Sequence, residues 1–168
     1  MLKLRPATPQ DSGTIVQLIR ALAEYEREPQ AAVVIEADIL RDGFGDSPKF
    51  RVIIAEWDGL PAGFAFFFYN YSTWLGRPGL YLEALFGKTE FRGRGIGKAL
   101  LQRVAQIAVE ENCCRFQWQV LDWNQPAIDF YRSTGARMMS EWLTMRAEGD
   151  EIRRVAGLDA NPEKADKP

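Results

Sequence analysis

The sequence predicts a single-domain, mixed α/β protein, and three observations lead to that prediction. The chain has 168 residues, a length that fits one domain and leaves little room for a second. Segments with apolar residues at helical spacing alternate with short β-type segments, in the order β-α-α-β-β-β-α-β-α-β. Hydrophobic residues make up 46% of the chain and charged residues 26%, as in globular proteins whose core needs no disulfide or metal.

Three elements are expected in the first 45 residues. Residues 2–5 alternate weakly and predict a short first strand. Residues 10–28 carry apolar side chains at helical spacing, which predicts an amphipathic helix with Asp11 among its N-cap candidates. Pro29 closes this helix, and a second, shorter helix is predicted over residues 36–44.

Three strands are predicted in the middle of the chain. Residues 50–57 are rich in β-branched side chains, and Asp58-Gly59 is a hairpin turn signal. The return strand is expected at residues 63–71, and a further strand at residues 80–88. Gly87 inside the last of these indicates a bulge or a close approach by another backbone.

The remaining elements follow the same alternation. Residues 95–112 have helical periodicity, and residues 115–121 alternate as a strand. Asn124 is expected to cap a helix that Gly135 ends, and residues 138–147 predict a last strand. The domain is therefore expected to span residues 1–147, followed by a polar, fraying tail at residues 148–168.

Composition argues against several classes of function. The net charge of −2 gives no reason to expect nucleic acid or an anionic membrane as a partner. The N-terminus lacks the apolar core of a secretory signal, and residues 62–69 are too short to span a bilayer. Adjacent Cys113 and Cys114 fit free thiols in a reducing compartment. We therefore expect a cytoplasmic protein.

The chain contains no histidine. Ser-His-Asp and Cys-His machinery is therefore excluded, as are nearly all catalytic zinc sites, and no metal is expected. A general base must be Asp, Glu, Tyr, Lys, Cys or water.

The segment Arg92-Gly93-Arg94-Gly95-Ile96-Gly97 joins a predicted strand to a predicted helix. Glycines there let backbone N–H groups approach a phosphate, and the helix N-terminus adds positive potential. A Walker loop would need Gly at Arg92 and Ser or Thr at Ala99, and a dinucleotide loop would need Gly at Lys98. The pattern Arg/Gln-x-x-Gly-x-Gly/Ala is met; the alternative is a tight structural turn.

Several motifs in the same order make residues 4–136 resemble the spermidine/spermine and thialysine acetyltransferase branch of the GNAT family. The matching pieces are Arg5-Pro6-Ala7-Thr8, Asp42-Gly43-Phe44-Gly45, Tyr71-Ser72-Thr73-Trp74, Tyr81-Leu82-Glu83, Phe91-Arg92-Gly93 with Gly95-Ile96-Gly97, Leu121-Asp122-Trp123-Asn124-Gln125, and Phe130-Tyr131 with Gly135-Ala136.

The resemblance implies the GNAT (acyl-CoA N-acyltransferase) fold, with a mostly antiparallel, splayed sheet flanked by helices. It implies acetyl-CoA as co-substrate, lying between the strands at residues 80–88 and 115–121, and a homodimer. The implied cofactor-binding residues are Leu85, Phe86, Gly87, Arg92, Gly93, Arg94, Gly95, Ile96, Gly97, Lys98, Asn124, Gln125, Pro126, Ala127 and Tyr131.

The resemblance also assigns two catalytic residues. Glu83 matches a base that acts through water, and Tyr131 matches an acid beside the sulfur. The chemistry needs both, because an alkylamine with a pKa of roughly 10 must lose a proton and the departing thiolate must gain one. A structural carboxylate and an aromatic core residue are the respective alternatives.

The amine pocket is likewise placed by resemblance. The implied residues are Tyr25, Glu26, Ser72, Trp74, Glu83, Gln117, Trp118 and Gln119. Polyamine-acetylating relatives carry carboxylates where this chain has Ser72 and Ala84, so the anionic partners of a polycation are lost; the thialysine-type branch also has a carboxylate in place of Ala84. We expect a lysine analogue, thialysine or a diamine, with polyamine acetylation, protein acetylation and a non-catalytic acetyl-CoA sensor as alternatives.

Overall fold

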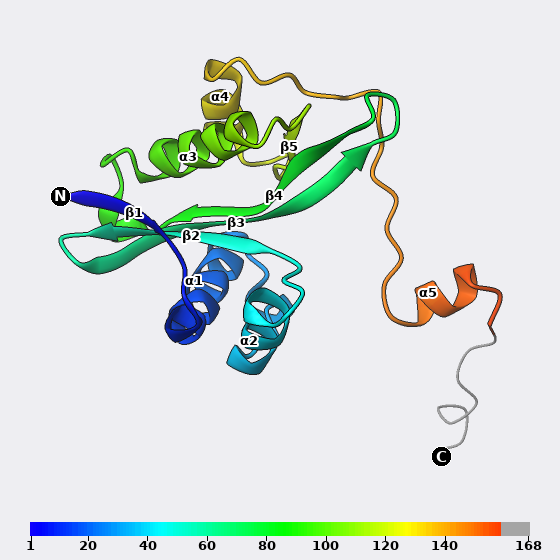
Figure 1. The fold of residues 1–168 in the computed structure, drawn as a ribbon, viewed down its shortest axis with the longest axis horizontal. Helices are drawn as coiled ribbons and strands as arrows, with labels where there is room; N and C mark the ends of the chain where they lie inside the picture. Colours follow the sequence, from blue (N-terminus) through cyan, green and yellow to red (C-terminus); the bar gives the residue numbers. More distant parts are fainter. Residues whose placement is uncertain (159–168) are drawn as a thin grey trace. The chain divides into compact units, whose positions relative to one another are not determined.

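The computed structural model describes residues 1–158 and contains a five-stranded sheet with the strand order β1-β2-β3-β4-β5 (Figure 1). The strands are β1 Leu2–Pro6, β2 Arg51–Trp57, β3 Leu60–Ser72, β4 Arg77–Gly87 and β5 Phe116–Trp118. Strands β1 to β4 are antiparallel and β5 is parallel to β4, which confirms the expected mixed, mostly antiparallel sheet. The chain divides into two compact units after Asn124, and the sheet belongs to the first.

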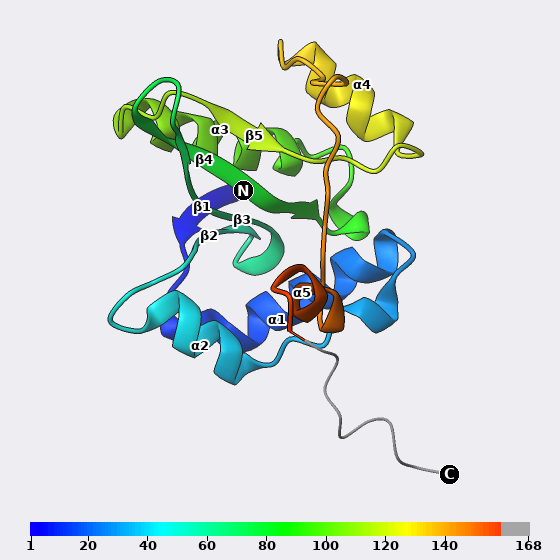
Figure 2. The same ribbon diagram turned by 90° about the vertical axis from the view of Figure 1, so that its right-hand side faces the viewer.

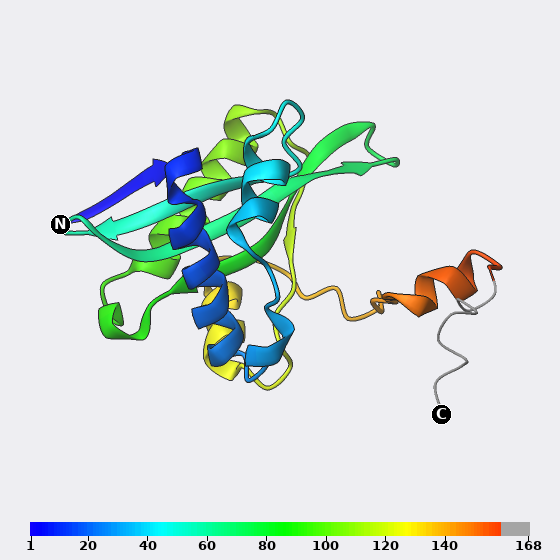
Figure 3. The ribbon, with the colours of Figure 1, turned by 90° about the horizontal axis from the view of Figure 1, so that it is seen from below.

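Three helices cover the two faces of this sheet. Helices α1 Ser12–Tyr25 and α2 Glu36–Phe44 lie on one face, and α3 Ile96–Glu110 lies on the other (Figure 2 and Figure 3). One-turn 3-10 helices lie at Pro9–Asp11, Pro29–Ala31 and Thr89–Phe91. Asp11 is the N-cap residue of α1, but its carboxylate accepts hydrogen bonds from Arg5 and from the Thr8 N–H instead of capping the helix.

The apolar side chains that recur at helical and strand spacing form a core in two halves, one on each face of the sheet. On the α1–α2 face, eight buried side chains form one apolar cluster: Ile15, Val16, Leu18, Ile39, Val52, Ile54, Phe64 and Phe86. On the other face, Leu100, Val104 and Ile107 of α3 are buried, and α3 contacts β2, β3 and β4. Burying apolar stripes from both helical layers against one sheet is the arrangement that an α/β pattern favours.

The β2–β3 hairpin forms as predicted at Asp58-Gly59. Both residues have positive φ values, 50° and 83°. Positive φ at both central positions is the signature of the turn whose twist matches that of antiparallel strands.

The bulge in β4 is at Glu83, so the suggestion of a bulge at Gly87 was wrong. Phe66 pairs with Ala84 and Phe67 pairs with Leu82, which leaves Glu83 as the extra residue. The other suggestion for Gly87, a close backbone approach, is confirmed at the Gly63–Gly87 pair. A Cβ on Gly63 would lie 2.4 Å from the Phe86 carbonyl oxygen and 3.1 Å from the Gly87 Cα.

The second unit contains α4 Gln125–Ser133 and α5 Asp150–Val155. Gly135 follows α4 with a φ of 89°, as expected of a residue that ends a helix. The strand predicted at residues 138–147 was wrong, since these residues form no strand in the described structure. A strand needs a neighbour for its backbone N–H and C=O groups, and this segment has no ladder partner within the described chain.

Two further expectations concern the ends of elements. Strand β5 is shorter than the predicted strand at residues 115–121, because its ladder with β4 covers Phe116 to Trp118. The tail expected to fray from residue 148 contains α5, and its residues 159–168 lie outside the described structure. Among residues 1–158, no helix is long and apolar enough to cross a membrane.

Candidate active site

Strands β4 and β5 separate next to the bulge. Their last paired residues are Leu82 and Trp118, so Glu83 on β4 and Gln119 after β5 mark the point of separation. Beyond it, residues 85–87 pair with β3 on one edge and, within the described chain, with no strand on the other. The separation leaves backbone N–H and C=O groups of β4 available to a ligand between the strands.

The glycine turn lies between the end of β4 and the start of α3. Gly93 and Gly95 have φ values of 76° and 72°, and Gly95 is the N-cap of α3. A Cβ placed on Gly93, Gly95 or Gly97 would meet no atom within 4 Å, so the turn faces open space. The first N–H groups of a helix have no partner within the helix, so this open turn has the features of an anion-binding site.

The two arginines of the turn have different surroundings. The Arg94 guanidinium lies over the ring of Trp57 at 4.5 Å from its centroid and is 5.5 Å from that of Phe91. Arg92 lies 5.8 Å from the ring centroid of Tyr25 at the end of α1. Cation–π contact holds Arg94 against Trp57 and places Arg92 beside Tyr25, a residue of the predicted amine pocket.

Tyr25 connects three predicted parts of the site. Its ring centroid lies 6.3 Å from that of Phe86 on β4, and its hydroxyl donates to Asn124 Oδ1 at 3.5 Å. Together with the contact to Arg92, these contacts bring the end of α1, β4, the glycine turn and Asn124 together. The structure therefore groups predicted substrate-binding and cofactor-binding residues in one region.

Two carboxylates belong to this region or its border. Glu83 is exposed at the bulge. Glu26 follows Tyr25 and is exposed overall, yet partial desolvation of its carboxyl raises the pKa of Glu26 above its usual value. A raised carboxyl pKa is common at functional sites, and nothing in the sequence around Glu26 indicated it.

The β3–β4 hairpin holds two other predicted pocket residues. Ser72 is only 4% exposed, and its Oγ accepts a hydrogen bond from the Leu75 N–H at 3.2 Å within the turn. Trp74 is 86% exposed at the tip of the hairpin. Ser72 thus has a structural contact, and Trp74 does not form the wall of an enclosed pocket.

The predicted residues of β5 lie beside a polar contact that the sequence did not indicate. Gln117 Oε1 accepts a hydrogen bond from Asn70 Nδ2 at 2.9 Å, which links β5 to β3 across β4. The ring of Trp118 packs on Phe116, with 4.9 Å between centroids. Asn70 Oδ1 and Arg115 Nε are buried and have no hydrogen-bond partner among residues 1–158.

The other predicted residues belong to the second unit. Gln125, Pro126 and Ala127 form the first turn of α4, where Gln125 Nε2 donates to Asp129 Oδ1 at 2.7 Å. Tyr131 lies in the same helix, half-buried, with its ring centroid 5.3 Å from that of Phe130.

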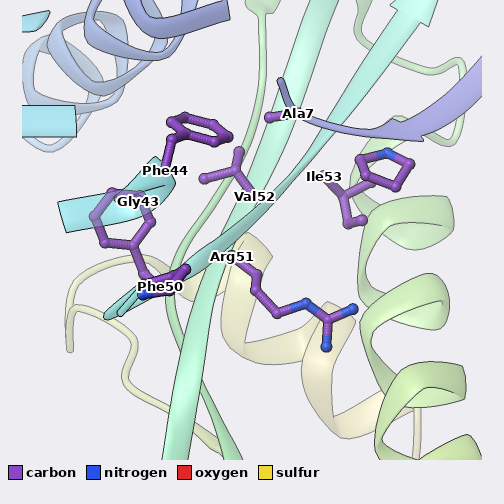
Figure 4. Close-up of a pocket in the computed structure, with 9 residues that line it drawn as sticks. Ala7, Gly43, Phe44, Phe50, Arg51, Val52 and Ile53 are labelled. Atoms are coloured by element: carbon purple, nitrogen blue, oxygen red, sulfur yellow. The ribbon is translucent and has the colours of Figure 1, made fainter. Parts of the chain in front are cut away.

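Two cavities on the α1–α2 face were not predicted. The larger, which we call the α1–α2 cavity, has a volume of about 460 Å³. It is lined by residues 31–34, Ile19, Asp38, Ile39, Asp42, Phe50 and Phe66. The smaller, about 220 Å³, lies between β1, β2 and the end of α2 (Figure 4).

Phe50 lies between these cavities and lines both. Its ring stacks on that of Phe66, with 4.1 Å between centroids. Gly43 leaves room for it, because a Cβ there would lie 2.6 Å from the Phe50 ring (Figure 4). No cluster of three or more His, Cys, Asp or Glu side chains within residues 1–158 is arranged to hold a metal ion.

Known proteins resemble this chain both in sequence and in fold. The sequence profile of the acetyltransferase (GNAT) family matches residues 15–136. A thialysine N-epsilon-acetyltransferase of Sus scrofa is 38% identical over 165 residues, covering 92% of this chain and 96% of the relative. A spermidine/spermine N(1)-acetyltransferase-like protein of Homo sapiens is 36% identical, covering 92% of this chain and 24% of that protein.

Among solved structures, an integron cassette protein from the mobile metagenome of V. cholerae superposes with a TM-score of 0.78 at 26% identity. The superposition covers 92% of this chain and 97% of that one. Sequence and fold thus point to the same family of proteins.

Proposed function

Because the chain belongs to the GNAT family and is an N-acetyltransferase for a small-molecule amine, we propose that it acetylates a primary amine of the lysine, thialysine or diamine type. One observation carries this proposal. An open glycine turn lies at one end of β4, whose bulge at Glu83 coincides with the separation from β5. The relatives' names support an amine carried on a short alkyl chain.

GNAT acetyltransferases use acetyl-CoA, which supplies the acetyl group as a thioester. The residues present fit such a group, because the turn at Gly93, Gly95 and Gly97 faces open space and the edge of residues 85–87 has no strand beside it within the described chain. We propose that N–H groups of residues 93–98 and the Arg92 and Arg94 side chains hold the pyrophosphate. Residues 85–87 would hydrogen-bond the pantetheine, and residues 124–127 would flank the cofactor.

Two side chains would move the protons. An amine nucleophile must be neutral, and Glu83 is proposed to accept its proton at a carboxylate oxygen through water. The Tyr131 hydroxyl is proposed to donate a proton to the leaving sulfur. Glu26, whose pKa is raised by desolvation, is a second carboxylate and the competing candidate for the role of Glu83.

Carboxylates at positions 72 and 84 do not select the amine, because this chain has Ser72 and Ala84 there. Ser72 Oγ is occupied in the hairpin turn, and Ala84 packs against the apolar cluster of the α1–α2 face. Neither residue supplies a negative charge to a polycation. This supports a lysine-like amine or diamine in preference to spermidine or spermine.

We also propose a cytoplasmic homodimer whose catalytic domain spans residues 1–147, with a polar tail at residues 148–168. The segment at residues 138–147 supports the dimer, because it exposes Trp142 by 66%, Leu143 by 85% and Met145 by 91%. Exposed apolar side chains gathered on one segment indicate an interaction surface.

The test is thiol release from acetyl-CoA with thialysine, lysine, diamines, spermidine and a lysine peptide as acceptors. Saturable release with lysine-like amines or diamines is the expected result. Preference for the peptide would favour protein acetylation, which the exposed Trp74 would permit. Cofactor binding without release for any amine would identify a sensor.

Three variants test the proton transfers. Glu83→Gln and Tyr131→Phe are each expected to lower kcat about 100-fold, because general acid or base catalysis contributes about 10²–10⁴-fold. Glu26→Gln tests the other predicted carboxylate; because Glu26 is assigned to the amine pocket and not to proton transfer, it is expected to raise KM for the amine and to change kcat much less. If Glu26→Gln has the larger effect, Glu83 is not the base.

A further inference from the structure

The end of α1, residues 25–27, contacts each of the three segments that are proposed to bind the cofactor. The Tyr25 ring centroid lies 6.3 Å from that of Phe86 on β4 and 5.8 Å from the Arg92 guanidinium of the glycine turn. The Tyr25 hydroxyl donates to Asn124 Oδ1 at 3.5 Å. One short segment therefore joins β4 to the chain that follows β5, beyond the point where these two strands separate.

Arg27 adds a second contact to the chain that follows β5. Its guanidinium carbon lies 3.9 Å from the centroid of the Trp123 ring, well within the distance of about 6 Å at which a cation and an aromatic face attract. Glu26 and Glu28 flank Arg27 in the sequence, yet its guanidinium forms no ion pair among residues 1–158. The arginine is thus directed to the tryptophan ring and not to the neighbouring carboxylates.

The backbone at Arg27 has a conformation that favours glycine. The Arg27 N–H donates to the Glu24 carbonyl oxygen at 3.1 Å and the Glu28 N–H to that of Ala23 at 2.9 Å, the two hydrogen bonds of a Schellman helix end. The left-handed residue of this motif is usually glycine, and here it is Arg27 with a φ of 66°. Strained residues of this kind concentrate at functional sites. The contact with Trp123 is a role that glycine, the unstrained residue there, could not fill.

We infer that Arg27 is a positioning residue for acetyl transfer: by holding Trp123, it fixes the end of α1 to the chain that carries Asn124. The inference rests on the proposed function and extends it, because Tyr25 and Glu26 of the amine pocket then share one support with the cofactor site. This support keeps both parts of the site in their binding geometry before the substrates arrive. Binding then costs less conformational entropy.

The expected effect follows from the strength of the contact. An exposed cation–π pair contributes a factor of about two to five to an equilibrium constant. Arg27→Gly is therefore expected to raise the Kd of acetyl-CoA and the KM of the amine about two- to fivefold each. The kcat is expected to change less than about twofold, because Arg27 takes no part in the proton transfers proposed for Glu83 and Tyr131.

A matched control lies at the end of α3. Asn112 has a φ of 55° and the same left-handed position, since its N–H and that of Cys113 donate to carbonyl oxygens of α3 at 3.1 Å and 2.8 Å. Arg27→Gly and Asn112→Gly each remove a left-handed side chain together with one side-chain contact. Because relief of strain offsets the lost contact, each Tm is expected to change by less than about 4 °C.

The experiment measures the Kd of acetyl-CoA by calorimetry in the absence of an amine, so it needs no turnover. We expect a rise of about two- to fivefold in Arg27→Gly, no change in Asn112→Gly, and partial restoration in Arg27→Lys, which keeps a cation for the ring. Trp123→Leu should raise the Kd as much as Arg27→Gly does. Combining the two substitutions should add nothing further, because both remove the same contact.

Equal Kd values in Arg27→Gly and Asn112→Gly overturn the inference. Additive effects of Arg27→Gly and Trp123→Leu also overturn it, since the two residues would then act separately. If the natural protein binds acetyl-CoA but acetylates no amine, the proposed function fails, and the same Kd values still confirm or refute the role of Arg27 at the cofactor site. Absence of acetyl-CoA binding in the natural protein overturns the proposed function and the inference together.

Discussion

Gly95 and Gly97 lie two residues apart at the start of α3. They differ in backbone conformation, and replacing each of them by alanine tests that difference. Gly95 has a φ of 72°, whereas Gly97 lies within α3 and is not among the glycines of positive φ. A Cβ meets no atom within 4 Å at either position. Any difference between the two alanine variants therefore comes from backbone conformation and not from a clash.

The magnitudes follow from the conformations. An alanine forced into the left-handed region costs about 1–2 kcal/mol, so Gly95→Ala should lower the free energy of unfolding by that amount. Gly97→Ala should raise it by about 0.5–1 kcal/mol, because alanine is the better helix former. For a chain of this size 1 kcal/mol changes Tm by roughly 2–4 °C. Gly95→Ala is then expected to melt roughly 2–8 °C lower, and Gly97→Ala roughly 1–4 °C higher.

Thermal unfolding with and without acetyl-CoA measures both the strain and the role of the turn. Acetyl-CoA should raise the Tm of the natural protein and of Gly97→Ala similarly, since the family pattern allows alanine there, and should raise that of Gly95→Ala less. Equal changes in Tm at the two positions would refute the claim that positive φ requires glycine at residue 95. An undiminished acetyl-CoA effect in Gly95→Ala would remove this turn from the binding site.

Three further predictions concern stability and assembly. Asp11→Asn should lower the free energy of unfolding by about 2 kcal/mol at pH 7, because Asp11 accepts two hydrogen bonds of 2.8 Å from Arg5. The Arg5 guanidinium holds the pKa of Asp11 below its usual value, so this contribution is present above pH about 4 and is lost as the pH falls further; denaturant unfolding from pH 3 to 7 should show the difference closing. Gly63→Ala should cost about 3 kcal/mol or more in the same assay, because its Cβ would lie 2.4 Å from the Phe86 carbonyl oxygen, and a cost below 0.5 kcal/mol would contradict that contact. Leu143→Asp should shift the protein from dimer to monomer in light scattering if residues 138–147 form the interface, and an unchanged mass would exclude this position from it.

The sequence was most informative where structure depends on near neighbours. The predicted bounds of α2 match the observed Glu36–Phe44, because its apolar spacing and the following Gly45 act within a few residues. The turn at Asp58-Gly59 formed for the same reason. The glycine turn lies, as predicted, between a strand and a helix, β4 and α3.

Errors occurred where the outcome depends on a partner distant in sequence. The bulge lies at Glu83 because the register of β4 is set by β3, and the glycine at residue 87 gave a misleading local signal. Residues 138–147 have the composition of a strand, but a strand forms only beside another, and within residues 1–158 no strand pairs with this segment. The hydrogen bond from the Leu75 N–H to Ser72 Oγ within the hairpin was likewise not indicated by the local sequence.

The sequence by itself determined the family and the order of the elements as far as α4, because motifs and periodicities are properties of the linear chain. The tertiary structure alone decided which side chains meet. It brought Tyr25, Phe86, Arg92 and Asn124 together, and it opened a cavity between α1, α2 and the sheet. It also raised the pKa of Glu26 through desolvation. Cavities, pKa shifts and strand register arise from packing between segments distant in sequence, and local patterns carry no record of that packing.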